Sequence, residues 1–316
     1  MPEYLIAGIA AAAIALMGLP IMIPILRGLK FGQTVREDGP QSHLAKSGTP
    51  TMGGCVFCVA MPGAMLLSGS VTVESALAIG LILAMGALGF LDDFLKIKRH
   101  SADGLSARQK MAGQIVFAAL FATGLWLTRG GAVWLPFVDR HLDLGIFIIP
   151  LAAFVIIATA NGVNFTDGVD GLCSGVTFLV AIAFFLLSLE WRMPQTARLA
   201  AALAGSCLGF LCFNLHPAKV FMGDTGSLSL GAAVAALALL TDTALLLPLL
   251  GVIYVAEVSS VILQVRYFKM TGGKRLFRMS PIHHHFELCG WNEMRVDLVF
   301  WLTTAIAAAA FLWIVI

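Results

Sequence analysis

Long apolar stretches recur along the whole chain, and they limit its possible folds more than any other feature. Hydrophobic residues make up 59% of the 316 and charged residues only 12%, whereas charged residues make up about a quarter of an ordinary soluble domain. A helix needs about 20 mainly apolar residues to cross a bilayer, and the stretches between charged residues reach this length repeatedly. The sequence therefore predicts an all-α, polytopic integral membrane protein.

Ten stretches have the composition of a membrane-spanning helix, and we expect all ten to cross the bilayer. Each connection between them is shorter than the roughly 50 residues that a further domain needs, so residues 1–316 are expected to form one transmembrane domain. The expected spans are 4–26, 51–67, 76–91, 111–128, 144–160, 173–189, 199–213, 228–240, 244–265 and 298–316.

The basic residues are divided unequally between the two sides that this topology defines. Sixteen of the twenty Lys and Arg residues lie in the odd-numbered connections, and the even-numbered ones hold the other four, Arg129, Arg140, Arg192 and Arg198. Because short cytoplasmic loops carry the excess of Lys and Arg, we expect the odd connections in the cytoplasm and both termini outside.

Sixteen basic groups on one face favour anionic lipid headgroups and anionic substrates as partners. Nucleic acid is a poor alternative, because these groups are spread over short loops rather than gathered in a domain or a basic arm. Nearly all side chains capable of chemistry lie in the same odd connections.

Asp92 and Asp93 follow the third apolar stretch, at the expected C-terminus of its helix. A carboxylate there meets the negative end of the helix dipole, which costs a few tenths to about 1 kcal/mol, so two together need a nearby cation. Lys96 can supply it as an i,i+4 ion pair; the functional alternative is a bound Mg²⁺ or a base that acts on phosphate. Successive side chains on a helix diverge by about 100°, so we expect the two carboxylates to have different roles.

The loop 161–175 has the sequence NGVNFTDGVDGLCSG, with four glycines and no basic residue. Glycine permits turns that bring side chains together around a ligand, and Asn and Asp oxygens are the hard donors that Mg²⁺ prefers. Asn164, Asp167 and Asp170 are therefore candidate ligand-binding residues. The alternative is a pair of Asx turns that join two helices.

The loop 214–231 has the sequence NLHPAKVFMGDTGSLSLG and places Asp224 near the expected start of the eighth span. Asp224 can cap that helix. The alternative is a carboxylate that binds a metal beside free helix amides, a combination that suits a Mg²⁺-diphosphate.

Three consecutive histidines, His283, His284 and His285, lie in the segment SPIHHHFELCGW (280–291). Adjacent side chains diverge and no second cluster has zinc spacing, so contacts with phosphate oxygens are favoured over a zinc site. Glu257 lies inside the ninth apolar stretch, where a charge costs about 2.5–3.5 kcal/mol. A helix break or a helix contact is expected there, and no chemical role is assigned to Glu257.

Five segments together resemble the MraY family, the phospho-N-acetylmuramoyl-pentapeptide transferases of bacterial cell-wall synthesis. They are GTPTMGG (48–54), LGFLDDFLKIKR (88–99), NGVNFTDGVDGL (161–172), NLHPAKVFMGDTGSLSLG (214–231) and SPIHHHFELCGW (280–291). The five segments follow one another in order, one in each odd connection. The resemblance implies a homodimer of ten-helix subunits in the bacterial inner membrane, with the active site on the cytoplasmic face. It also implies the reaction of UDP-MurNAc-pentapeptide with undecaprenyl phosphate to give lipid I and UMP, with Mg²⁺ as cofactor.

The resemblance also implies roles for individual residues. By motif position, Asp224 is similar to the family's magnesium-binding aspartate. Asp92 and Asp93 correspond to its essential aspartate pair, and His283 and His284 to its essential histidines. Lys96 and the imidazoles, His285 included, are expected to stabilise the transferring oxygens, and Phe221 to stack on uracil. The residues that fall where the family lines its nucleotide and phosphate site are Lys46, Thr51, Asn164, Asp167, Asp170, Asn214 and Phe221.

Two other functions share part of this pattern. A sister transferase that moves GlcNAc-1-phosphate would share the aspartate loops, and HHHFE (283–287) favours the muramoyl-pentapeptide substrate. A secondary transporter would also have ten helices, but it would place ionisable groups near the bilayer midplane. In this chain nearly all of them lie at one face, and Glu257 is the one inside a stretch.

Overall fold

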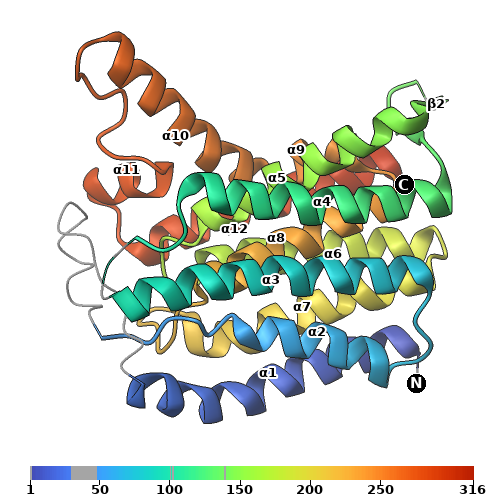
Figure 1. Cartoon of the computed structure of the whole chain (residues 1–316), viewed down its shortest axis with the longest axis horizontal. Helices are drawn as coiled ribbons and strands as arrows, with labels where there is room; N and C mark the ends of the chain where they lie inside the picture. The colour runs from blue at the N-terminus through green and yellow to red at the C-terminus, as the bar shows by residue number, and fades with distance from the viewer. Residues whose placement is uncertain (1, 30–47, 100, 102, 139) are drawn as a thin grey trace.

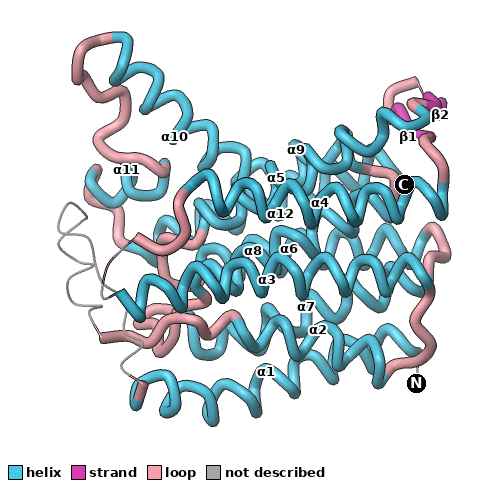
Figure 2. The backbone as a smooth tube through the Cα atoms, viewed as in Figure 1, coloured by secondary structure: helices cyan, strands magenta, loops and turns pink. Residues whose placement is uncertain are grey.

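The computed structural model describes residues 2–29, 48–99, 101, 103–138 and 140–316, so Lys46 lies outside the described residues. Helices dominate this part of the chain (Figure 1, Figure 2). The helices are α1 (Glu3–Gly28), α2 (Cys55–Leu67), α3 (Val73–Arg99), α4 (Ala107–Arg129), α5 (Ile148–Thr166), α6 (Leu172–Glu190), α7 (Pro194–Asn214), α8 (Gly223–Leu240), α9 (Leu247–Leu250), α10 (Val252–Met270), α11 (Ile282–Leu288) and α12 (Glu293–Val315), with 3-10 turns η2 (Gly145–Phe147) and η3 (Ala244–Leu246). A short antiparallel hairpin, β1 (Ala132–Leu135) and β2 (Arg140–Asp143), was not predicted.

Most of these helices are suited to a membrane. Among the described residues, eight helices are long and apolar enough to cross a bilayer, and Ala244–Leu250 with Val252–Met270, bent by 82°, make a ninth candidate. α2 has only 13 residues. The protein is therefore an all-α, multi-pass membrane protein, as predicted. Each of the ten predicted stretches contains a helix, and the number of crossings stays a prediction.

Several helix ends differ from the prediction, and three of them lie near the predicted site. α3 continues through Asp92 and Asp93 to Arg99, because its last turn is basic and favours the C-terminal end of the dipole. The expected dipole penalty on the two aspartates was therefore wrong. α8 begins at Gly223 and so includes Asp224. α2 begins only at Cys55, because the backbone N–H groups of Gly53 and Gly54 donate to the carbonyls of residues 221 and 222.

α8 lies at the centre of the bundle, and every residue from Thr225 to Leu240 is buried. It packs against α3 and α5. Glycines allow the close approach: a Cβ atom on Gly89 of α3 would lie 2.2 Å from the Asp224 carbonyl oxygen, and one on Gly54 would lie 2.1 Å from the Cα of Gly226. Small residues at helix interfaces are typical of membrane proteins. Here they bring α3 and the segment 48–54 onto the start of α8.

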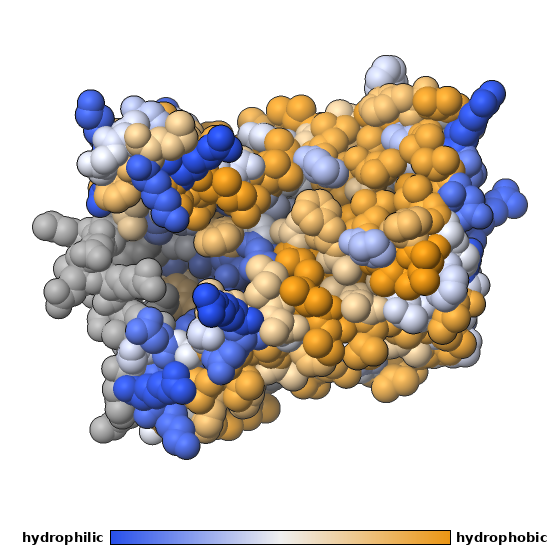
Figure 3. Space-filling view, turned by 45° about the horizontal axis from the view of Figure 1, so that its top comes forward, coloured by the Kyte–Doolittle hydropathy of each residue, from blue (hydrophilic) through white to orange (hydrophobic). Residues whose placement is uncertain are grey.

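The two ends of the bundle differ. The hairpin and both termini lie at one end, and α11 and the outer part of α10 lie at the other (Figure 1). Figure 3 shows a broad apolar band between hydrophilic residues at the two ends, as expected for a chain that crosses a bilayer. On the face shown there, a hollow with hydrophilic residues opens towards one end.

Candidate active site

Three aspartates from two helices meet at the α11 end of the bundle: Asp92 and Asp93 of α3, and Asp224 in the first turn of α8. One oxygen from each lies within 4.8 Å of the others, and Asp92 and Asp93 are buried. We refer to these three residues as the aspartate cluster. Carboxylates this close repel one another, so they require positive charge nearby.

Two lysines supply that charge. The Lys96 ammonium lies 2.6 Å from Asp92 Oδ2, 3.7 Å from Asp93 Oδ1 and 2.9 Å from Asp224 Oδ2. Lys110 of α4 places its Nζ 2.8 Å from the same Asp224 oxygen. The i,i+4 pair expected for Lys96 is present, but it belongs to a network that joins three helices. Two ammonium groups thus face three carboxyl groups, so the cluster holds more acidic than basic groups.

Asp93 caps α8 from a different helix. Its Oδ2 accepts hydrogen bonds from the backbone N–H and the hydroxyl of Thr225, at 2.9 and 2.8 Å, and its Oδ1 accepts one from the N–H of Asp224 at 3.2 Å. These amides have no partner within their own helix. The side chain of Asp224 makes no cap bond, so the alternative in which Asp224 caps this helix was wrong. Its carboxylate is free to face the lysines.

Asp92 has other partners. Its Oδ1 accepts a hydrogen bond from the N–H of Leu105 at 2.7 Å, which fixes the chain just before α4. A Cβ atom on Gly104 would lie 2.5 Å from the same oxygen, so only glycine lets the backbone approach this closely. The divergence of neighbouring side chains on α3 thus gives the two aspartates separate surroundings, as predicted.

The C-terminal turn of α5 lies against the aspartate cluster. The amide nitrogen of Asn164 donates to Asp224 Oδ1 and to the Ser227 hydroxyl, both at 2.7 Å. Asp167 follows directly after α5. Loss of solvent raises the pKa of Asp167 to about 8, with further contributions from the negative charges of Asp224 and Asp93. Without an added cation, Asp167 therefore holds a proton at neutral pH.

The three histidines of α11 point to three different partners. His283 Nδ1 lies 3.1 Å from Glu257 Oε1 on α10. His284 Nδ1 lies 2.7 Å from Glu287 Oε2. His285 Nδ1 accepts the N–H of Arg278 at 3.1 Å. Their divergence agrees with the prediction, and the helix contact expected at Glu257 is the one with His283.

The turn that follows α5 lies against His283. His283 is 1% exposed, and a Cβ atom on Gly168 would lie 2.1 Å from its Nε2. Gly168 follows Asp167, whose pKa responds to the charges of the cluster. The loop after α5 thus lies against the imidazole at Gly168, and at Asp167 it lies within electrostatic range of Asp224 and Asp93.

Asp170 and Asn214 hold neighbouring loops together. His216 Nδ1 lies 3.2 Å from Asp170 Oδ2 and 3.6 Å from Glu293 Oε2. Asn214 accepts the N–H of Gly171 at 3.1 Å and donates to the carbonyl of Val220 at 3.0 Å. Both predicted substrate-binding residues are buried, and they tie the loop after α5 to the loop before α8.

The segment that carries Thr51 pairs with the loop that carries Phe221. The N–H of Phe221 donates to the carbonyl of Pro50 at 2.9 Å, and the N–H of Gly53 donates to the Phe221 carbonyl at 2.8 Å. Gly223 has a φ of +68°, which favours glycine. A Cβ atom there would lie 2.6 Å from Asp93 Oδ2 and 2.9 Å from the Thr51 hydroxyl, so Thr51 lies beside the cluster.

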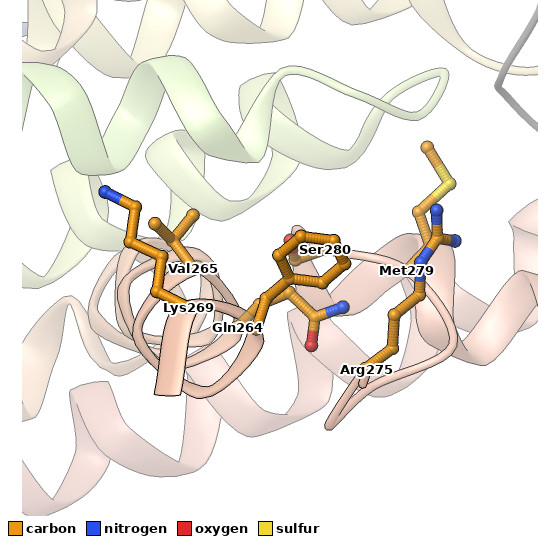
Figure 4. Close-up of a pocket in the computed structure, with 7 residues that line it drawn as sticks. Gln264, Val265, Lys269, Arg275, Met279 and Ser280 are labelled. Atoms are coloured by element: carbon orange, nitrogen blue, oxygen red, sulfur yellow. The ribbon is translucent and has the colours of Figure 1, made fainter. Parts of the chain in front are cut away.

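A separate cavity of about 290 Å³ lies between the outer end of α10 and the loop to α11 (Figure 4). Gln264 shapes it, because its side-chain oxygen accepts the N–H groups of Leu276 and Phe277 at 3.0 and 2.9 Å. Its lining residues are Gln264, Val265, Phe268, Lys269, Arg275, Met279 and Ser280. None of them belongs to the predicted site.

Lys110 was missed by sequence reasoning. It appeared only as one of many loop lysines at the start of an apolar stretch, and no motif set it apart. Its contact with Asp224 spans 114 residues. The signal available was its position in the first turn of α4, which faces α3 and α8.

Comparison with known proteins decides the family. Residues 75–242 match the model of glycosyl transferase family 4, and residues 46–58 match phospho-N-acetylmuramoyl-pentapeptide-transferase signature 1. The phospho-N-acetylmuramoyl-pentapeptide-transferase of Heliobacterium modesticaldum is 49% identical over 98% of this chain and 96% of its own length. That of Moorella thermoacetica is 49% identical over 97% and 96%, and that of Clostridioides difficile 50% identical over 92% and 90%. The chain belongs to the phospho-N-acetylmuramoyl-pentapeptide-transferase family.

The resemblance to the MraY family is thereby confirmed. The family 4 model runs from α3 to the residues that follow α8, and so contains the aspartate cluster and both of its lysines. The transferase signature covers the segment that pairs with the start of α8. α10, α11 and α12 lie beyond the family 4 model, but inside the match to the Heliobacterium transferase, which covers 98% of this chain.

Proposed function

We propose that the chain transfers phospho-MurNAc-pentapeptide from UDP-MurNAc-pentapeptide to undecaprenyl phosphate. The products are lipid I and UMP, the reaction serves peptidoglycan synthesis, and Mg²⁺ is the cofactor. The observation that carries the proposal is 49% identity, over nearly the full length of both chains, to proteins of that name. The aspartate cluster and its lysines support it, because transfer of a phosphoryl group depends on positioned charge.

The aspartate cluster fits Mg²⁺. Its three carboxylate oxygens within 4.8 Å are hard donors. The Lys96 ammonium contacts all three carboxylates and marks a position where positive charge is stabilised. We expect Asp224 to hold the ion, through the carboxylate that Lys96 and Lys110 now contact. When bound, Mg²⁺ neutralises diphosphate oxygens and makes UMP a better leaving group.

The reaction forms a bond between a phosphate oxygen of the lipid and the β-phosphorus of the UDP-sugar, and breaks the bond from that phosphorus to UMP. We expect Asp92 to take the remaining proton from the lipid phosphate. A phosphate monoester has a second pKa of about 6, so much of it is already deprotonated at neutral pH. The contribution of Asp92 as a base is therefore modest and partly positional. Lys96 stabilises the transferring oxygens.

Other residues bind and orient the substrates in this proposal. Phe221 stacks on uracil. Asp93 keeps the start of α8, and with it Asp224, in place. The remaining predicted contacts to nucleotide and phosphate are Lys46, Thr51, Asn164, Asp167, Asp170, Asn214 and His285, together with the imidazoles of His283 and His284.

We further propose ten membrane crossings in a homodimer, with both termini outside and the aspartate cluster at the cytoplasmic face of the bacterial inner membrane. The excess of Lys and Arg in the odd connections supports this orientation. Both termini lie at the end of the bundle opposite α11 (Figure 1), which agrees with an even number of crossings.

Release of UMP by purified protein in detergent tests the function. With undecaprenyl phosphate and Mg²⁺, we expect UMP from UDP-MurNAc-pentapeptide and none from UDP-GlcNAc. The opposite preference would assign the GlcNAc-1-phosphate transfer instead. Absence of UMP with either sugar would leave a transporter and contradict the transferase proposal.

Asp224→Asn tests the metal assignment. The change keeps the size of the side chain and removes its charge, so we expect activity to vanish while the protein stays folded. Near-normal turnover would remove Asp224 from the site.

A separate experiment distinguishes direct displacement from a two-step covalent mechanism. In a covalent scheme an aspartate would carry the phospho-sugar between two steps. Isotope exchange between UMP and the UDP-sugar without lipid would favour that scheme, and absence of exchange would favour direct displacement.

A further inference from the structure

Glu257 and His283 lie against each other in the interior of the protein. The Oε1 of Glu257 lies 3.1 Å from the Nδ1 of His283. Glu257 is 0% exposed and His283 is 1% exposed. α10 and α11, which carry them, are separated by a loop of eleven residues.

The two side chains depend on each other. Within the described part of the chain, no hydrogen bond reaches the carboxylate oxygens of Glu257 or the ring nitrogens of His283, and the 3.1 Å contact between Oε1 and Nδ1 is the interaction that joins them. A buried carboxylate without a partner is strongly unfavourable. Because a carboxylate only accepts, the proton of the imidazole is assigned to Nδ1, the nitrogen that faces Glu257. This leaves Nε2 as the nitrogen with no partner of its own.

Glu257 is held on a rigid part of α10. One turn earlier, the Tyr254 hydroxyl lies 2.8 Å from the Thr177 hydroxyl of α6. A Cβ atom on Gly162 of α5 would lie 3.0 Å from the Cβ of Tyr254, so α10 packs directly on α5 at this level. The carboxylate therefore cannot follow the imidazole if the imidazole turns.

The Nε2 of His283 faces the loop that follows α5. Its Nε2 is the atom nearest to the position of a Cβ on Gly168, at 2.1 Å. The neighbouring residue, Asp167, is within electrostatic range of Asp224 and Asp93. The orientation of the imidazole thus determines which ring atom of His283 packs against the turn at Asp167 and Gly168.

We propose that Glu257 is a positioning residue of the transferase: it holds His283 with Nδ1 towards its own carboxylate and Nε2 towards the turn at Gly168, beside the aspartate cluster. The inference rests on the proposed function. It gives a role to the one acidic residue inside an apolar stretch, whose charge is otherwise costly in a membrane. Residues that orient a histidine through its second nitrogen fix its tautomer and its direction.

Glu257→Gln tests the proposal, with UMP release as the assay. The variant keeps the size of the side chain but loses the charge that fixes the Nδ1 proton. We expect kcat to fall about tenfold or more, while the KM for the UDP-sugar changes less than about threefold. Ser260→Ala on the same helix is the matched control, because it removes a buried hydroxyl bonded to the Glu257 carbonyl but leaves the carboxylate intact.

A double-mutant cycle separates positioning from general stability. If Glu257 acts through His283, then Glu257→Gln changes kcat less than about twofold in a His283→Asn background. Wild-type kcat in Glu257→Gln, or losses that multiply in the double variant, would overturn the proposal. Where the single variant fails to accumulate, Glu257→Asp replaces it, with an expected loss in kcat of at least about threefold; wild-type kcat there would also overturn it.

The wild type distinguishes failure of this inference from failure of the proposed function. If the wild type releases no UMP from either sugar, the transferase proposal fails. If the wild type is active and the cycle shows no coupling, the transferase stands and only the role of Glu257 is wrong.

Discussion

The carboxylate of Asp93 accepts two hydrogen bonds from Thr225, one from the backbone N–H at 2.9 Å and one from the hydroxyl at 2.8 Å. An acid on α3 is thus the N-terminal cap of α8, although 132 residues separate the two. The same contact fixes Asp224, which precedes Thr225, relative to Asp92, which precedes Asp93. The geometry of the aspartate cluster therefore depends on this cap.

Asp93→Ala is expected to destabilise the protein as well as to inactivate it. Two backbone N–H groups and one hydroxyl lose their acceptor, which lowers the free energy of unfolding by about 2–4 kcal/mol. Thermal unfolding in detergent without substrate measures the change. Asp93→Asn keeps an acceptor oxygen and should unfold at a temperature between those of Asp93→Ala and the wild type. Equal unfolding temperatures for Asp93→Ala and the wild type would contradict the cap.

Lys110→Met is expected to reduce transfer without unfolding the protein. Lys110 provides one of two ammonium groups on Asp224 Oδ2, so its loss changes the charge at the aspartate cluster. We expect kcat/KM to fall by about tenfold or more. Lys98→Met is the matched control, because Lys98 is exposed at the end of α3. The same loss in both variants would show that Lys110 acts only through the general charge of this face.

The sequence predicted the helical class and the convergence of its polar loops, because both follow from patterns of local composition. Apolar stretches locate helices regardless of how the helices pack. The charged and amide residues of the odd connections must lie at one end if the helices alternate in direction. Asp92, Asp93, Asn164 and Asp224 do meet there.

The partners of those residues were not predictable, since they depend on packing between distant segments. Sequence reasoning considered Asp224 as the cap of α8 and did not consider Asp93, because capping preferences apply to the residue next to the helix in the sequence. No sequence motif indicated that Lys110 would contact Asp224. The pairing of Glu257 with His283 required α10 and α11 to be placed in space. Of the two alternatives expected at Glu257, a helix break or a helix contact, the contact is present, and the nearest break lies six residues earlier, at Gly251.

Asp167 should contribute to the stability of the wild type a term that decreases as pH rises from about 4 to about 8 in the absence of Mg²⁺. Desolvation raises the pKa of Asp167 to about 8 in the folded state, whereas an unfolded Asp titrates near 3.9. Between these values the folded state holds a proton that the unfolded state has released, so the unfolding free energy decreases with pH. Below the lower value the contribution is fully present, and above the higher value it is lost.

Asp167→Asn isolates that contribution. The amide cannot ionise, so the unfolding temperature of the variant should vary less between about pH 4 and pH 8 than that of the wild type. Parallel curves for the two proteins would show that the Asp167 carboxyl is ionised throughout.

Gly168→Ala should uncouple His283 from the rest of the site. Gly168 has no unusual backbone angle, since its φ is not among the positive ones, so alanine is allowed there by the backbone. Its methyl group would lie 2.1 Å from His283 Nε2 and 2.6 Å from Cε1, closer than any real contact, so the imidazole or the turn must move. We expect kcat to fall about tenfold or more.

Gly80→Ala on α3 is the control for this variant, because a methyl group there meets nothing within 4 Å and alanine is favoured over glycine in a helix by about 1 kcal/mol. In a His283→Ala background the new methyl group has room, and Gly168→Ala should then have little further effect. A loss of kcat that is the same in both backgrounds would show that Gly168 is required for a reason other than the space it leaves for His283.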